Sequence, residues 1–318
     1  MSNKNKEGPL ADWQTTCWQG ISVQTPDDWA VSHVNGDYKD GYIRWADEEG
    51  TLRLEIRWSE APASDDIEQV LMDYLSDVTK AAKRTNRQIL TRTDTKLLTS
   101  RQVSRRKVMC FTIETDWVGH GLVWKCPRCE RRVIAQVMGN DPDGTRELAL
   151  NVLQTLSDHS EEINNEWSIY GLNVKVPNDF DLETSQLEYN VTELHFKRDE
   201  SANITVARWT LADIRLRNTT LNAWTAHTLK DKLKQFKIYQ RPSEITTHTG
   251  LYLNGQRKAP GKLARSFFRQ LTKTDAPPDF FGWVWPCEQS NRILMVTAFL
   301  PATELQTVHT VAESVACH

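Results

Sequence analysis

One stretch of this chain occurs twice. Residues Gly20–Trp29, Gly-Ile-Ser-Val-Gln-Thr-Pro-Asp-Asp-Trp, return as Gly171–Phe180, Gly-Leu-Asn-Val-Lys-Val-Pro-Asn-Asp-Phe, 151 positions later and without a gap. Further matched pairs keep a similar spacing: Arg57-Trp58 with Arg208-Trp209, and Trp124-Lys-Cys126 with Trp285-Pro-Cys287. Copies of about 150 residues are too long to be units of a solenoid and have the size of ordinary domains. The repeat therefore predicts two domains with the same fold in tandem.

The charge and hydropathy of the chain limit its partners. Its 318 residues carry 39 basic and 42 acidic side chains, a net charge of −3, so neither a polyanion nor a membrane surface is expected as an obligatory partner. No apolar run approaches the roughly 20 residues that cross a bilayer. Residues 1–12 lack the apolar core of a signal peptide and are expected to form a disordered lead. We therefore expect a cytoplasmic protein.

The hydrophobic pattern of each copy predicts strands, a helix, more strands and a final helix. In copy one, Leu52–Trp58 alternates between apolar and charged residues, as in an antiparallel sheet with one solvated face. A helix capped by Ser64 follows, and a last helix is expected from Thr145 to about His159. The predicted fold class is α+β: two tandem homologous domains, each an antiparallel β-sheet with two main helices packed on one face.

Copy two follows the same order, with one irregularity. Its first helix is expected to carry Leu221, Thr225, Leu229, Leu233 and Phe236. Ile204 and Val206 have the opposite strand parity to Trp209, which predicts a bulge or a register slip if Trp209 points inward. The expected segments of the chain are a lead at 1–12, domain 1 at 13–158, a charged linker at 159–166 and domain 2 at 167–318.

The order of these elements, together with a strand followed by Pro-x-Asp and an aromatic residue, resembles the PsbP-like fold. The residues that carry the resemblance are Pro26-Asp-Asp28-Trp29 in copy one and Pro177-Asn-Asp179-Phe180 in copy two. That fold is shared by a photosystem subunit, a Ran nucleotide-release factor and several small bacterial proteins, and its members mostly bind proteins without catalysis. The resemblance implies a tandem duplication of a PsbP-like domain and a protein-binding role.

Cysteines and histidines occur at matched places in the two copies. Cys126-Pro-Arg-Cys129 has the spacing at which two thiols grip one zinc ion or form a redox dithiol. No second Cys-x-x-Cys exists, so further ligands must come from elsewhere in the chain. In each copy the last helix would return its final histidine toward the start of the last hairpin. We predict one cluster of Cys126, Cys129 and His159, and a second of Cys287, Cys317 and His318.

Three interpretations of these thiols stay open. They could be buried structural cysteines without metal, because a free cysteine packs as a small hydrophobic residue. They could bind zinc, centred on Cys126 and Cys129. They could pair oxidatively, as Cys287 with Cys317 under oxidising conditions. Zinc is the only cofactor that the sequence suggests.

The common catalytic motifs are missing, and no small-molecule substrate can be named. The sequence contains no glycine-rich nucleotide loop, no nucleophile elbow and no His-Glu-x-x-His. His120 stands between two glycines, which favours a turn over a catalytic base. Basic runs at 101–107, 128–132 and 230–237 are candidates for nucleic-acid contact, although such runs more often form a solvated face.

These observations give three functional hypotheses. The first is a non-catalytic protein-binding or accessory subunit of a larger intracellular assembly. The alternative is a zinc- or thiol-dependent protein centred on Cys126 and Cys129. The third is a nucleic-acid- or ribosome-associated factor.

Overall fold

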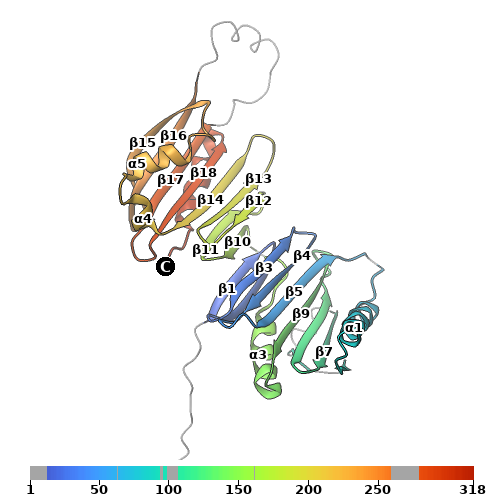
Figure 1. Ribbon diagram of the computed structural model, residues 1–318. Coiled ribbons are helices and arrows are strands. Elements are labelled where there is room, and N and C mark those ends of the chain that lie inside the picture. Colours follow the sequence, from blue (N-terminus) through green and yellow to red (C-terminus); the bar gives the residue numbers. More distant parts are fainter. Residues whose placement is uncertain (1–12, 63, 94–95, 99–106, 161, 259–278) are drawn as a thin grey trace, which may run out of the picture. The chain divides into compact units, whose positions relative to one another are not determined.

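The computed structural model describes residues 13–62, 64–93, 96–98, 107–160, 162–258 and 279–318. The expected lead at 1–12 and most of the basic run at 101–107 lie outside these residues. The chain divides into two compact units, Met1–Glu161 and Glu162–His318, and both are rich in strands (Figure 1). Within the described residues, no helix combines the length and the apolar character that crossing a membrane requires.

The described residues of unit 1 form a seven-stranded antiparallel sheet, a two-stranded hairpin and two helices. The sheet has the order β3-β4-β5-β9-β8-β7-β6. Its strands are β3 Ala30–Gly36, β4 Asp40–Ala46, β5 Leu52–Glu60, β6 Leu90–Arg92, β7 Lys107–Glu114, β8 Val118–Lys125 and β9 Arg131–Gly139. The hairpin is β1 Trp13–Trp18 with β2 Ile21–Pro26, and the helices are α1 Ile67–Arg84 and α3 Pro142–Thr155.

The two helices of unit 1 lie on opposite faces of this sheet. Tyr74 of α1 donates a hydrogen bond to the side chain of Gln136 on β9, at 2.8 Å. Gly139, on the same strand, faces Thr145 of α3, whose Oγ1 would lie 2.2 Å from an added Cβ. Side chains alternate between the two faces along a strand, so Gln136 and Gly139, three residues apart, lie on opposite faces of the sheet. The expectation that both helices pack on one face is therefore wrong for unit 1.

Aspartates, rather than the expected residues, cap the N-termini of both helices of unit 1. Asp66, not Ser64, caps α1 by accepting a hydrogen bond from the Glu68 amide. Asp141 caps α3, with Pro142 in the first turn, so α3 begins and ends earlier than expected. The helix stops at Thr155, and His159 lies in the segment that follows it.

Unit 2 has the same strand order. Its sheet runs β12-β13-β14-β18-β17-β16-β15. The strands are β12 Asp181–Leu187, β13 Val191–Lys197, β14 Asn203–Thr210, β15 Phe236–Ile245, β16 His248–Arg257, β17 Asp279–Cys287 and β18 Arg292–Leu300. A hairpin, β10 Asn164–Ile169 with β11 Leu172–Pro177, accompanies α4 Ala212–Leu216, α5 Leu221–Thr228, the short 3₁₀ helix η1 Ala302–Glu304 and α7 Leu305–Glu313. Helix α5 is shorter than expected, since Leu233 lies beyond it and Phe236 begins β15.

The central strands of unit 2 are buried on both faces. In β14, Ile204 and Val206 are 0% and 1% exposed, and Trp209 on the other face is 7% exposed. Trp209 packs in a core with Leu229 and Leu233, which follow α5. The pairing of β14 with β13 and β18 is continuous, so the expected bulge is absent from this strand. Ile204 and Val206 can point to the face opposite Trp209 because both faces of the sheet are covered. The expectation of one solvated face is therefore wrong for this strand.

The Arg-Trp pairs matched in sequence are not equivalent in the sheets. Trp58 pairs with Val133 of β9. The residue of β18 that lies 161 positions after Val133 is Leu294, and its partner on β14 is Arg208 rather than Trp209. A one-residue shift therefore turns Trp58 and Trp209 to opposite faces of their sheets. Unit 1 has a register irregularity at the end of β4, just before β5.

Matched hairpin turns contact an arginine in each unit, buried in unit 1 and half-buried in unit 2. Gln19 and Gly20, which join β1 to β2, have φ of 51° and 81°, and the turn from β10 to β11 has the same signs. Two features favour glycine at position 20. Its φ is positive, and a Cβ there would lie 2.9 Å from the Arg131 guanidinium. Arg131 donates to the Gln19 carbonyl at 2.7 Å, and Arg292 donates to the Gly171 carbonyl at 2.8 Å.

Candidate metal centres and a polar groove

Four potential ligands meet at one end of the unit 1 sheet. The ligand atoms of Cys126, Cys129, Asp158 and His159, called cluster 1, all lie within 4.8 Å of one another. Cys126 Sγ is 3.5 Å from His159 Nδ1, and Cys129 Sγ is 3.4 Å from Asp158 Oδ2. His159 Nδ1 is 3.1 Å from Asp158 Oδ1. The predicted trio is thus brought together, and Asp158 joins it.

The backbone holds cluster 1 from two sides. The turn from β8 to β9 carries both cysteines and is closed by the Cys126 amide, which donates to the Arg131 carbonyl at 2.8 Å. After α3, Ser157 exchanges two backbone hydrogen bonds with Ser22 of β2, at 2.8 and 2.9 Å. This short bridge, rather than a helix end, brings Asp158 and His159 to the cluster. The expected route through the helix C-terminus was therefore wrong, although the residues meet.

A second group lies at the matching place in unit 2. His248, Cys287, Cys317 and His318, called cluster 2, also have ligand atoms within 4.8 Å of one another. His318 Nδ1 lies 3.4 Å from Cys287 Sγ and 3.3 Å from Cys317 Sγ. His248 Nε2 lies 3.5 Å from Cys317 Sγ. The Ala316 amide donates to the Asn173 carbonyl of β11, which fixes the end of the chain beside the sheet.

Three of the four positions correspond between the clusters, and the fourth does not. Cys126 matches Cys287, and Asp158-His159 matches Cys317-His318. The fourth ligand is Cys129 in unit 1, from the turn after β8, but His248 in unit 2, from the start of β16. Ser290 stands at the position of Cys129 in unit 2. Each unit thus completes a set of four from a different element.

Sequence reasoning missed Asp158 and His248. Asp158 precedes His159 as Cys317 precedes His318, so the alignment of the copies contained a signal for it. His248 had no such signal, because only the two-residue hairpin turn from Ile245 to His248 brings it beside Cys317.

The thiols of the clusters differ in acidity. Burial and the neighbouring Asp158 raise the pKa of Cys129 to about 11. Burial also favours the neutral form of Cys287, but hydrogen bonds from Ser290 and the two histidines outweigh it and lower its pKa to about 6. Burial and the adjacent Cys287 raise the pKa of Cys317 to about 12. Without a cation, neighbouring acidic groups therefore cannot all ionise near neutral pH.

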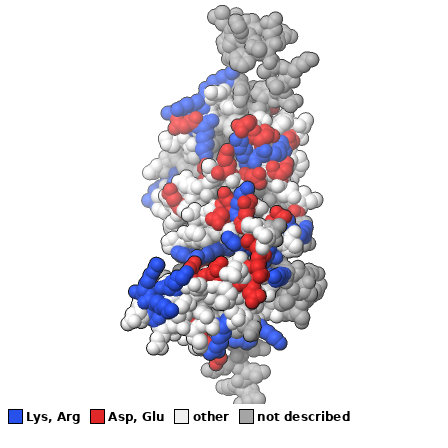
Figure 2. Space-filling model, turned by 90° about the vertical axis from the view of Figure 1, so that its right-hand side faces the viewer, with Lys and Arg blue, Asp and Glu red and all other residues white. Residues whose placement is uncertain are grey.

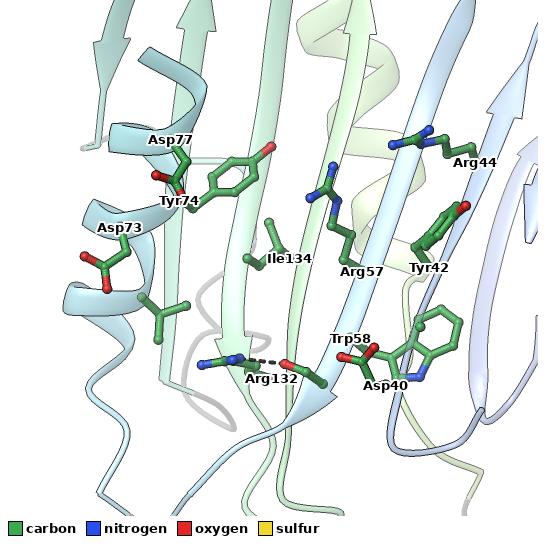
Figure 3. Close-up of a pocket in the computed structure, with 13 residues that line it drawn as sticks. Asp40, Tyr42, Arg44, Arg57, Trp58, Asp73, Tyr74, Asp77, Arg132 and Ile134 are labelled. Atoms are coloured by element: carbon green, nitrogen blue, oxygen red, sulfur yellow. Dashed lines mark hydrogen bonds between the residues drawn. The ribbon is translucent and has the colours of Figure 1, made fainter. Parts of the chain in front are cut away.

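A polar groove of about 550 Å³ lies in unit 1 between α1 and the face formed by β4, β5 and β9 (Figure 3). Its lining combines aromatic, basic and acidic side chains: Asp40, Tyr42, Arg44, Arg57, Trp58, Asp73, Tyr74, Asp77 and Arg132, with Gly41, Ser59, Val70 and Ile134. The floor is the charged face of β5 that the alternation pattern predicted. In unit 2 the corresponding face is apolar and belongs to the core around Trp209.

Ion pairs fix the arginines of the groove. Arg44 and Arg57 both bind the carboxylate of Glu55, and the Arg57 contact is 2.5 Å. Arg132 lies 3.1 Å from Asp65. Burial raises the pKa of Tyr74 to about 12. Burial lowers the pKa of Arg57, but the hydrogen bond to Glu55 outweighs it and raises that pKa. Both shifts move away from neutrality, the opposite of what acid–base catalysis requires.

The remaining candidates have structural or paired roles. His120 lies on β8, not in a turn, and its Nδ1 is 3.2 Å from Thr112 Oγ1. Several basic residues of the predicted runs form ion pairs, among them Lys107 with Asp66, Arg132 with Asp65 and Lys232 with Glu193. On the face drawn in Figure 2, basic and acidic side chains are interspersed. This mixture does not favour a nucleic-acid surface.

Comparisons with known proteins give similarities of fold outline only. No family model matches the chain, and no curated protein matches it. The immunity protein TplEi of T6SS from Pseudomonas aeruginosa, solved in complex with "L" peptide, is 12% identical, with a TM-score of 0.36; the match covers 96% of this chain and 98% of that one. The Saccharomyces cerevisiae Ran-binding protein Mog1p is 14% identical, with a TM-score of 0.31, over 48% of this chain and 95% of its own. At these TM-scores neither similarity carries a functional argument.

Proposed function

We propose that the chain is a non-catalytic binding protein, and that the groove of unit 1 receives a peptide segment of a protein partner. The observation that carries this proposal is the composition of the groove. Tyrosine, tryptophan and arginine are the residues enriched where protein interfaces gain most of their free energy. Tyr42 and Tyr74 stand here beside three arginines, in an opening of about 550 Å³, whereas Trp58 at its edge is 2% exposed.

The charges of the groove define the segment that would fit. Arginines 44, 57 and 132 come from the sheet side, whereas Asp73 and Asp77 come from α1. A complementary segment therefore presents an acidic side chain to the sheet and a basic one to the helix. Because Glu55 already orders Arg44 and Arg57, little side-chain entropy remains to be lost on binding.

The proposal also covers the origin of the two units and the location of the protein. The two units would be copies of one PsbP-like domain, a view supported by their common strand order and matched hairpin turns. Among the described residues of unit 2, the face that corresponds to the groove is an apolar core around Trp209, so the copies would have diverged in use. Cysteines clustered with histidines suit a reducing compartment, and we place this accessory subunit in the cytoplasm.

Affinity purification from the native cell with two matched variants tests the proposal. Arg57→Ala removes a groove arginine, and Arg87→Ala removes an arginine of unit 1 that does not line the groove. We expect a partner that the unmodified chain and Arg87→Ala capture and Arg57→Ala loses at least tenfold. Equal melting temperatures exclude misfolding as the cause. The same partners captured by all three chains, or a turnover abolished by Arg57→Ala, would contradict the proposal.

A further inference from the structure

Several distances within the two clusters are close to the edges of a zinc coordination tetrahedron. Zinc binds sulfur at about 2.3 Å and nitrogen or oxygen at about 2.0–2.2 Å, so neighbouring ligand atoms around a tetrahedral ion are roughly 3.3–3.8 Å apart. In cluster 1, the Asp158 carboxylate lies 3.1 Å from His159 Nδ1 through Oδ1 and 3.4 Å from Cys129 Sγ through Oδ2, and Cys126 Sγ lies 3.5 Å from His159 Nδ1. The contacts in cluster 2 are 3.3, 3.4 and 3.5 Å. In each cluster these three contacts are near the length of a tetrahedral edge, and all the ligand atoms lie within 4.8 Å of one another.

We propose that each unit binds one zinc ion: cluster 1 through Cys126, Cys129, Asp158 and His159, and cluster 2 through His248, Cys287, Cys317 and His318. Two thiolates with imidazole favour zinc over magnesium or calcium, which prefer oxygen ligands. Four protein ligands leave no position for water or substrate, so these are structural centres.

The charges of cluster 1 call for a cation. Asp158 is 0% exposed and Cys126 is 2% exposed, so a carboxylate and two potential thiolates share a site with little access to water. Buried anionic groups of this kind are paired or coordinate a metal. Arg131, whose guanidinium donates to the Asp158 carbonyl, supplies one positive charge at the edge of the site. One Zn²⁺ together with Arg131 balances the carboxylate and both thiolates.

The tautomer of His248 is set for coordination in cluster 2. The hydroxyl of Thr246 donates to the Ile245 carbonyl at 2.6 Å, so its oxygen accepts from His248 Nδ1, 3.3 Å away. Nε2 is then left with a free lone pair on the side of Cys317 Sγ. Such outer hydrogen bonds orient most histidine ligands. Thr246 also has a φ of 51°, an unusual conformation for a β-branched residue, in the turn that presents His248.

The centres tie the sheet to the segments that follow α3 and α7. Cluster 1 joins the turn after β8 to a segment 33 residues later in the chain. Cluster 2 joins β16 and β17 to the last two residues. The number of four ligands is kept although the fourth comes from a turn in one unit and from a strand in the other. Thiols that lie close together by chance would not be expected to have four potential ligands in both units.

Metal analysis of the full chain, purified without chelator and with Zn²⁺ in the medium, tests this proposal. We expect two zinc ions per chain. Cys129→Ser and His248→Ala should each reduce the content to one, and Cys110→Ser, which alters a cysteine outside both clusters, should leave two. The zinc retained in the other unit reports that this unit is folded. Replacement by Co²⁺ should give thiolate-to-cobalt charge-transfer bands and the visible spectrum of a tetrahedral site, halved in either ligand variant.

Three results would overturn the proposal. One is a chain that holds no stoichiometric zinc and takes up no Co²⁺. Another is a zinc content that Cys129→Ser and His248→Ala leave unchanged. The last is a metal-free chain in which mass spectrometry finds Cys126 joined to Cys129, or Cys287 to Cys317, as disulfides, which would make the clusters redox pairs.

Discussion

His248 and Cys317 lie 69 residues apart in the chain, yet His248 Nε2 is 3.5 Å from Cys317 Sγ. The contact depends on the tight turn between β15 and β16 and on the backbone bridge between Ala316 and Asn173. Neither residue belongs to a recognisable ligand motif. Cluster 2 is therefore brought together by the fold, whereas cluster 1 includes a short sequence motif.

Removal of the Arg131 side chain should strongly destabilise unit 1. This arginine is 1% exposed and donates to the carbonyls of Gln19, Tyr38 and Asp158. Arg131→Ala leaves buried acceptors unsatisfied and opens a cavity, at a cost of roughly 3–5 kcal/mol. Denaturant unfolding measures the change. Arg146→Ala, on the exposed side of α3, is the control, and an equal effect of the two would contradict this role.

Alanine should be tolerated less well at Gly20 than at Gly50. Both glycines have positive φ, 81° and 79°, so each substitution costs roughly 1 kcal/mol in backbone strain. At Gly20 the added Cβ also meets the Arg131 guanidinium, at 2.9 Å, whereas nothing lies within 4 Å of it at Gly50. Thermal unfolding of the two variants should therefore differ, with Gly20→Ala the less stable. Equal melting temperatures would count against the buried arginine as a steric constraint.

Burial on both faces of β14 predicts that neighbouring positions of opposite parity are both sensitive. Val206→Ala should cost about 2 kcal/mol and Trp209→Ala about 3–5 kcal/mol, because both side chains are in close-packed cores. Ser185→Ala, on the exposed strand β12, should change the free energy of unfolding by less than about 0.5 kcal/mol. A sheet with one solvated face would instead show one sensitive and one neutral position on β14.

Stability should decline at alkaline pH in a way that depends on Tyr74. Its pKa is raised by burial to about 12, above the usual value of 10, so the folded state holds the phenolic proton more tightly. That contribution is fully present below pH 10 and is lost as the pH rises toward 12. Tyr74→Phe should flatten the decline between pH 10 and 12, while costing about 1 kcal/mol at pH 7 through the lost bond to Gln136. An unchanged slope would place Tyr74 in contact with solvent.

The proximity of Cys126, Cys129 and His159 could be predicted from the sequence. The Cys-x-x-Cys motif and the matched positions in the two copies indicated which residues would lie together. The route was wrong, since α3 ends at Thr155 and a backbone bridge replaces the expected helix end. The place of His248 in cluster 2 could not be predicted from the sequence, because it depends on the register of the β15–β16 hairpin. The expectation of one solvated face was wrong for β14, because both faces of this strand are apolar and each packs in a core.

Native mass spectrometry of the full chain tests the two-centre account most directly. We predict that the folded chain is heavier than the acid-denatured polypeptide by two zinc ions, and that Cys129→Ser and His248→Ala are each heavier by one. A folded chain with the mass of the bare polypeptide, or lighter by two hydrogens for each disulfide formed, would contradict it.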